Sequence, residues 1–214
     1  MSKPSTPLSV FIVDDDDAFR DSLSWLLEST PFNILTFASG EAFLENYSGA
    51  PGCLLLDIRM PGISGLGLQQ ELIRREIKIP TLILTGHGDI PVAVSAIKNG
   101  ALNFIEKPFD DQVLLEQIDK AMVYATQWHQ DQKRQNQLGE RWNTLSKREK
   151  QVMQLVVSGL ANKVVAESLK ISPKTVEVHR ARVMAKMDAA SLADLVNQAH
   201  RITALKAVLA GHEG

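Results

Sequence analysis

Five short apolar runs alternate with helix-like segments through the first half of this chain, and this alternation constrains the fold more than any other feature. The runs are Val10–Val13, Ile34–Phe37, Cys53–Leu56, Thr81–Thr85 and Phe104–Ile105. Each run is apolar on both faces, as expected for a strand that helices cover on both sides. Strands that alternate with helical segments predict a parallel sheet joined by helical crossovers.

The crossovers are amphipathic stretches near Ala18–Glu28, Gly40–Asn46, Leu66–Arg75 and Val92–Lys98. We therefore predict an α/β domain, a doubly wound five-stranded parallel sheet with a flavodoxin-like arrangement. In such a sheet, sites form beyond the carboxyl ends of the strands.

A long helix should follow from about Asp110, because no Gly or Pro interrupts the chain between Pro108 and Gly139. Mostly apolar residues recur along this helix at alternating spacings of four and three. They form a seam that could extend beyond the first domain toward a partner helix. Its residues are Leu114, Ile118, Ala121, Ala125 and Trp128. Residues 127–137 are polar and Gln-rich, so we predict a first domain over 1–125, a helical, polar linker over 126–142 and a second domain over 143–214.

The second domain is predicted to be small and all-α. Ser146 can cap a helix with Glu149 at the capping-box position, and this helix ends near Gly159. A short helix over Asn162–Leu169 follows. Ser172 and Pro173 open a third helix, and a fourth begins near Ser191. The turn before the third helix predicts a helix-turn-helix.

The charge is distributed unequally between the two halves. Residues 1–120 carry 9 Lys and Arg against 17 Asp and Glu, whereas residues 121–214 carry 14 against 8. A basic segment suits a phosphate-backbone partner, and an acidic cluster attracts cations. With a single cysteine, no secretory signal and no apolar run of membrane-spanning length, the chain is expected to be cytoplasmic, with Cys53 a buried strand residue.

Chemically important side chains follow several predicted strands. Asp14 to Asp17 follow the first strand, and Asp57, Thr85 and Lys107 stand at the ends of three others. Because parallel strands end at one sheet edge, these groups should form one site. Such a set suits phosphoryl transfer to a carboxylate, with Asp57 as the nucleophile.

Mg²⁺ would take oxygen ligands from Asp15, Asp57 and the backbone carbonyl of Arg59, while Asp14 acts through a water or helps to fix the metal. The Lys107 ammonium and the Thr85 hydroxyl would contact the phosphoryl oxygens. His87, in a loop near this site, is expected to be a surface histidine.

The residues Asp14-Asp15, Asp57 in Leu-Asp-Ile-Arg-Met-Pro-Gly, Thr85-Gly-His and Lys107-Pro-Phe resemble the bacterial receiver domain over residues 8–125. The resemblance implies that a sensor histidine kinase phosphorylates Asp57. It also implies that Phe104 is the switch aromatic, which turns inward when Thr85 moves toward the phosphoryl group. Many relatives have Tyr there, so no hydroxyl contact is expected from Phe104.

Residues 145–187 carry nine basic side chains against three acidic ones. On the third helix of this domain, Val176, Val183 and Met187 share one face, which we predict to be the inner one. We expect His179, close to that face, to pack or form a local hydrogen bond rather than contact a base. The opposite face is the candidate DNA-reading surface, with Lys174, Thr175, Glu177, Val178, Ala181, Arg182 and Ala185.

Lys174 could contact a guanine edge or a phosphate, Glu177 a cytosine amino group, and Val178 or Ala181 a thymine methyl. Arg180 and Lys186 are assigned to phosphate contact or to an internal ion pair, with neither preferred. Lys163, on the preceding helix, is a candidate phosphate anchor.

The segments Leu145-Ser-Lys-Arg-Glu, Asn162-Lys163, Ile171-Ser-Pro-Lys-Thr-Val-Glu-Val-His-Arg and Met184-Ala-Lys-Met resemble the LuxR-type DNA-binding domain of FixJ/NarL response regulators. The two resemblances together imply a non-enzymatic transcription regulator. Its expected partners are promoter DNA and RNA polymerase. On phosphorylation, the face around Val92–Phe104 is expected either to bind a second copy of the chain or to release the DNA-binding domain.

Two alternatives remain open at this point. Strand-end aspartates and Mg²⁺ also serve phosphohydrolases, although those enzymes use the Asp of the first strand as nucleophile and the basic domain argues against them. The first domain could instead be an interaction module that is insensitive to phosphate.

Overall fold

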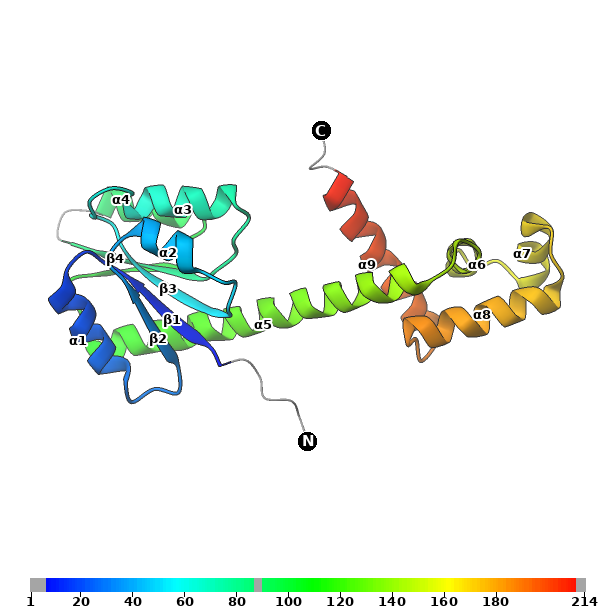
Figure 1. Ribbon diagram of the computed structural model, residues 1–214, viewed down its shortest axis with the longest axis horizontal. Helices are drawn as coiled ribbons and strands as arrows, with labels where there is room; N and C mark the ends of the chain where they lie inside the picture. The colour runs from blue at the N-terminus through cyan, green and yellow to red at the C-terminus, as the bar shows by residue number, and fades with distance from the viewer. Residues whose placement is uncertain (1–6, 87–89, 211–214) are drawn as a thin grey trace. The chain divides into compact units, whose positions relative to one another are not determined.

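The computed structural model describes residues 7–86 and 90–210. It contains two compact units, Met1–His129 and Gln130–Gly214. Figure 1 shows a sheet flanked by helices in the first unit and helices alone in the second. This arrangement confirms the predicted fold class for both.

The sheet of the first unit has five parallel strands in the order β2-β1-β3-β4-β5. They are β1 (Ser9–Val13), β2 (Asn33–Phe37), β3 (Gly52–Asp57), β4 (Thr81–Thr85) and β5 (Asn103–Glu106). This is the flavodoxin-like doubly wound order, in which ligands bind beyond the carboxyl ends of the strands.

Helices cover both faces of this sheet. They are α1 (Asp17–Leu27), α2 (Gly40–Asn46), α3 (Gly65–Arg74), α4 (Ile90–Lys98) and the beginning of α5 (Asp111–Thr144). Because side chains alternate along a strand, Val10 and Ile12 of β1 enter a core with α1 and α5, whereas Phe11 and Val13 enter a core with α2, α3 and α4. The two cores fix the sheet edge on which the candidate site lies.

The prediction that helices cover every strand on both faces is correct for β1, β3 and β4, which are buried throughout. It is wrong for β2, where Asn33, Leu35 and Thr36 are exposed. The physical reason is strand order, because β2 and β5 lie at the two edges of the sheet, where less of the molecule covers them; β5 is correspondingly only partly buried.

The seam along α5 packs within the first unit. Leu114, Ile118 and Ala121 belong to the core beneath β1 and β3, and Ala125 is also buried. The seam is therefore explained by packing on the chain's own sheet rather than by a partner helix. Trp128 is partly exposed, with the Lys78 ammonium 4.6 Å from its ring centroid. Helix α5 continues without a break through the Gln-rich stretch to Thr144.

The second unit contains the end of α5 and α6 (Lys147–Val157), α7 (Asn162–Leu169), α8 (Pro173–Met187) and α9 (Leu192–Ala210). The Ser146 hydroxyl accepts from the Glu149 N–H, and the Glu149 carboxylate accepts from the Ser146 N–H, which confirms the predicted capping box. Ser172 caps α8 with Pro173 at its first position, as predicted. Within the described ranges, no helix combines the length and the apolarity that crossing a membrane requires.

Candidate functional site

Three of the predicted site residues meet at the carboxyl edge of the sheet. Asp14 directly follows β1, Asp57 is the last residue of β3, and Lys107 directly follows β5. Lys107 Nζ lies 2.7 Å from Asp14 Oδ2 and 2.7 Å from Asp57 Oδ1. Lys107 lies 93 positions after Asp14 and 50 positions after Asp57 in the sequence, yet its ammonium group contacts both carboxylates. This agrees with the prediction that the strand ends meet at one edge of the sheet.

Burial dominates the electrostatics of this cluster. It raises the pKa of Asp57 above the ordinary value, although the Lys107 ammonium opposes this shift, and the nearby Asp14 charge adds to it. For Lys107, burial alone would lower the pKa, but the hydrogen bonds to Asp14 and Asp57 outweigh it and the pKa is raised. Two buried carboxylates therefore share one ammonium, which leaves a net negative charge that favours a cation.

The donor set fits Mg²⁺ although it is small. Among the residues that the structure describes, no three His, Cys, Asp or Glu side chains are arranged to hold a metal ion. Mg²⁺ keeps several waters and needs only one or two protein carboxylates, so Asp14, Asp57 and a loop carbonyl such as that of Arg59 are chemically sufficient. The predicted ligand Asp15 is exposed and adjoins this cluster in sequence.

The four consecutive aspartates have different positions. Asp14 is buried in the cluster, and its Oδ1 accepts from the Asp16 N–H at 3.0 Å. Asp16 caps α1 by accepting from the Phe19 N–H, and Asp17 pairs with Arg20 in the first turn. Two of the four therefore stabilise the start of a helix, where negative charge is favoured.

Thr85 and Phe104 lie on the adjacent strands β4 and β5. Thr85 is buried, and its hydroxyl donates to the Gly86 carbonyl at 3.1 Å. Phe104 is partly buried against the core on the α4 side of the sheet. The Arg59 N–H donates to Asp57 Oδ2 at 2.6 Å, so a hydrogen bond to the Asp57 carboxylate holds the start of the loop that follows β3. His87 lies outside the described residues.

Two residues beside this cluster were missed by the sequence reasoning. Arg20 Nη1 donates to the Asp14 carbonyl at 2.6 Å, and the ring of Phe19 has the Lys107 ammonium 3.8 Å from its centroid. Both contacts depend on how α1 turns back over the end of β1. The spacing of residues in the sequence does not predict these two contacts.

Helix α8 of the second unit presents the predicted faces. Val176, Val183 and Met187 are buried, as expected for the inner side. The predicted reading residues are exposed, apart from the partly buried Thr175; the exposed ones are Lys174, Glu177, Val178, Ala181, Ala185 and Arg182. Lys163 on α7 is exposed as well. A basic, solvent-facing helix surface is therefore available to a phosphate-rich partner.

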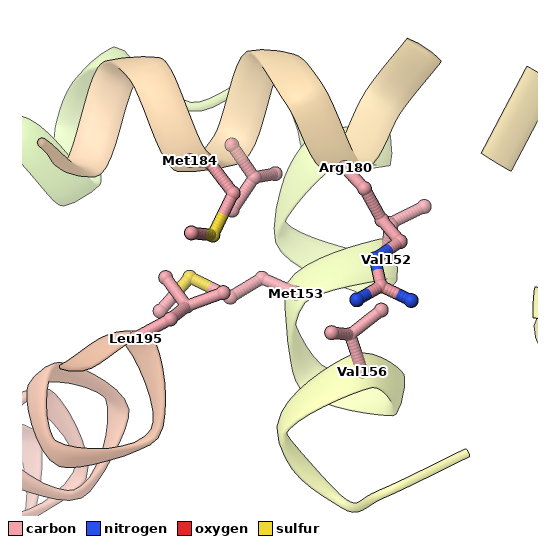
Figure 2. A pocket seen from close by; sticks show the side chains of 7 residues that line it. Val152, Met153, Val156, Arg180, Met184 and Leu195 are labelled. Atoms are coloured by element: carbon pink, nitrogen blue, oxygen red, sulfur yellow. The ribbon is translucent and has the colours of Figure 1, made fainter. Parts of the chain in front are cut away.

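Arg180 and Lys186 each make a contact with another helix of the second unit. Arg180 Nη1 donates to Asn162 Oδ1 at 2.6 Å, and Figure 2 shows its side chain beside Val152 and Val156 in a small apolar groove. Lys186 Nζ lies 2.7 Å from Glu149 Oε2, and this hydrogen bond lowers the pKa of Glu149. Lys186 thus forms an internal ion pair in this structure, whereas the Arg180 contact is a hydrogen bond with the neutral Asn162 side chain.

His179 is partly buried, and its Nδ1 is buried without a hydrogen-bond partner among the described residues. This environment agrees with the packing role predicted for it. A local hydrogen bond at that nitrogen is not formed.

Comparison with known protein families matches both units. Residues 10–119 match the response regulator receiver domain, and residues 143–199 match the luxR family of bacterial regulatory proteins. The chain is 46% identical over 195 residues to the transcriptional regulatory protein FixJ of Azorhizobium caulinodans, covering 90% of this chain and 92% of that protein. It is 47% identical over 198 residues to FixJ of Rhizobium meliloti, covering 91% and 96%.

Solved structures give the same result. The response regulator StyR superimposes with a TM-score of 0.84 at 42% identity, covering 92% of this chain and 100% of that one. Full-length FixJ from B. japonicum gives 0.55 at 42% identity, covering 92% and 98%. The luxR match favours gene regulation over the phosphohydrolase alternative. The chain belongs to the FixJ/NarL type of two-component response regulators, which regulate transcription through a receiver domain and a LuxR-type DNA-binding domain.

Proposed function

We propose that phosphoryl transfer from a sensor histidine kinase to Asp57 switches the DNA binding of this chain. The observation that carries the proposal is the Lys107 ammonium at 2.7 Å from both buried carboxylates, Asp14 and Asp57. A carboxylate oxygen of Asp57 forms the new P–O bond while the bond from phosphorus to the donor breaks. Lys107, at hydrogen-bond distance from the acceptor, then neutralises a phosphoryl oxygen.

Mg²⁺ is the cofactor that we assign to this site. Asp14, Asp15, Asp57 and the Arg59 carbonyl would hold it, in part through water. When bound, Mg²⁺ supplies positive charge to the phosphoryl oxygens. The chain's own groups orient the acceptor, because the Arg59 N–H holds one oxygen of Asp57 and Lys107 holds the other.

Thr85 and Phe104 form the proposed switch. The Thr85 hydroxyl would leave the Gly86 carbonyl and donate to a phosphoryl oxygen. Phe104 of β5 pairs with Ile83 of β4 and is partly buried on the α4 side of the sheet, and we place the inward turn of its ring there. The phosphoryl group would thereby favour one of two receiver conformations.

The output is sequence-specific binding to promoter DNA by the α8 surface. We assign base contacts to Thr175, Glu177, Val178, Ala181 and Arg182, phosphate contact to Lys163, and contact with either a guanine edge or a phosphate to Lys174. Arg180 and Lys186 reach phosphates only if their internal contacts with Asn162 and Glu149 open. Dimerisation through the face around Val92–Phe104 would add affinity through effective concentration.

The domain boundaries that we propose are 1–125 for the receiver, 126–142 for the linker and 143–214 for the DNA-binding domain. RNA polymerase is the expected partner at the promoter, and the cytoplasm the expected compartment. We assign no enzymatic turnover of an external substrate to the chain.

The proposal is tested by DNA selection and binding with and without acetyl phosphate and MgCl₂. Fragments selected by the phosphorylated full chain should bind more weakly to the unphosphorylated chain and to Asp57→Asn under all conditions. Phosphate-dependent binding that persists in Asp57→Asn would refute the switch. Exposed Asp119→Asn on α5 is the matched control and should respond to acetyl phosphate like the unmodified chain.

A further inference from the structure

The loop between β3 and α3, residues 58–64, contains Arg59, whose N–H donates to Asp57 Oδ2. Its base is closed by the Gly65 N–H, which donates to the Ile58 carbonyl at 3.0 Å. A Cβ on Gly65 would lie 2.2 Å from the Asp57 carbonyl oxygen, so the chain passes too close there for any side chain. The loop is therefore a tightly closed element built directly on the acceptor strand.

Two carboxylates hold backbone amides of this loop. Asp57 Oδ2 accepts from the Arg59 N–H at 2.6 Å, and Glu41 Oε1 accepts from the Ile63 N–H at 2.9 Å. Glu41 comes from α2, 22 residues earlier in the sequence. Along the chain, the Arg59 carbonyl lies between the two N–H groups that these carboxylates hold.

The approach of Glu41 depends on the backbone of Gly62. This residue has φ +73°, and a Cβ there would lie 2.7 Å from Glu41 Oε1. The Glu41 carboxylate also accepts from its own backbone N–H, and these backbone hydrogen bonds lower the pKa of Glu41. Glu41 is therefore an ionised acceptor, and the glycine leaves room for it.

We propose that Glu41 is a positioning residue for phosphorylation, holding the β3–α3 loop so that the Arg59 carbonyl faces the Mg²⁺ site. This inference rests on the proposed function of that site. The Asp57 contact with the loop involves the group that is itself modified. The Glu41 contact is independent of Asp57, so it can keep the carbonyl in place throughout the phosphorylation cycle.

The experiment compares substitutions of Glu41 in the full chain. Mg²⁺ binding is titrated calorimetrically with MgCl₂ alone, and the rate of phosphorylation is followed with acetyl phosphate. Glu41→Ala should weaken Mg²⁺ about tenfold, at the lower end of the loss for groups that orient metal ligands. The rate of labelling at subsaturating Mg²⁺ should fall in parallel and recover at high Mg²⁺.

Two further variants separate hydrogen bonding from charge. Glu41→Gln keeps an acceptor oxygen at the same reach and should bind Mg²⁺ within about threefold of the unmodified chain, because the proposed role needs an acceptor. Glu41→Asp keeps the charge but has a shorter reach, so it should behave like Glu41→Ala. The matched control is Glu45→Ala, which removes an exposed carboxylate from the same helix and should change neither quantity.

Equal Mg²⁺ affinity in Glu41→Ala and Glu45→Ala, with the unmodified chain binding normally, would overturn the positioning role alone. Weak binding by Glu41→Gln with normal binding by Glu41→Asp would also overturn it, since charge would then be the cause. Failure of the unmodified chain to bind Mg²⁺ or to be labelled would overturn the proposed function itself. Thermal unfolding of each variant establishes that the titrations are made on folded protein.

Discussion

Replacement of Lys107 by methionine would leave the buried Asp14 and Asp57 carboxylates facing each other without an ammonium. Removing one partner of a fully buried ion pair costs about 3–5 kcal/mol. The Lys107 side chain retains 23% exposure, and solvent screens part of the repulsion. We therefore expect a loss of about 2–3 kcal/mol in the free energy of unfolding of the first unit.

For a domain of intermediate size, each kcal/mol lost lowers the melting temperature by about 4 °C, so this loss corresponds to a decrease of about 10 °C. Mg²⁺ should offset it, because the variant site carries one more negative charge and binds the cation more tightly. At about one hundred times its dissociation constant, Mg²⁺ adds about 2.7 kcal/mol to the folded state. The difference between Lys107→Met and the unmodified chain should thus narrow as Mg²⁺ increases.

Thermal unfolding of the full chain, followed by calorimetry over a series of MgCl₂ concentrations, measures both effects. Lys120→Met is the matched control, because Lys120 is exposed on α5. If Lys107→Met unfolds at the temperature of Lys120→Met and responds to Mg²⁺ like the unmodified chain, the electrostatic account of the cluster is refuted.

Three further outcomes are expected. Glu149→Gln should destabilise the second unit near neutral pH, because it removes the negative charge that pairs with the Lys186 ammonium. The pKa of Glu149 in the folded protein lies below 4.5. The difference in stability between Glu149→Gln and the unmodified chain should therefore be complete above pH 4.5 and disappear as the pH falls through the folded pKa. A difference in stability that persists in acid would argue against the ion pair. Leu114→Ala should cost the first unit about 2–5 kcal/mol in urea unfolding, against about 0.5 kcal/mol or less for the exposed neighbour Val113→Ala, and equal losses would contradict the packing of α5. Lys174→Ala should weaken binding to all selected DNA fragments and reduce the salt dependence by about one counterion if it contacts a phosphate, whereas an unchanged salt slope with lost preference would assign it to a base.

The convergence of three receiver residues could be predicted because strand ends determine their positions. Asp14, Asp57 and Lys107 each adjoin a strand, and parallel strands end at one edge, so their meeting followed from local patterns. The exposure of β2 could not be predicted in the same way. Strand order, which makes β2 an edge strand, depends on pairing between distant segments and leaves no local signal in the sequence.

Identical residue types also limited the sequence reasoning. Asp14 to Asp17 are chemically alike, and only the start of α1 determines that Asp16 becomes a cap. The sequence alone does not decide whether Lys186 contacts a phosphate or forms an ion pair. Its partner Glu149 is 37 residues away, and only the packing of α6 against α8 brings the two together. The inner and outer faces of α8 were predictable because helical periodicity alone separates them.

The most direct test is site mapping of the phosphoryl group on the full chain. After incubation with acetyl phosphate and MgCl₂, mass spectrometry should find one added phosphoryl group per chain, on the peptide that contains Asp57, and none without Mg²⁺ or in Asp57→Asn. A phosphoryl group on Asp14 or Asp15, or equal labelling of Asp57→Asn, would contradict the assignment of Asp57 as the acceptor.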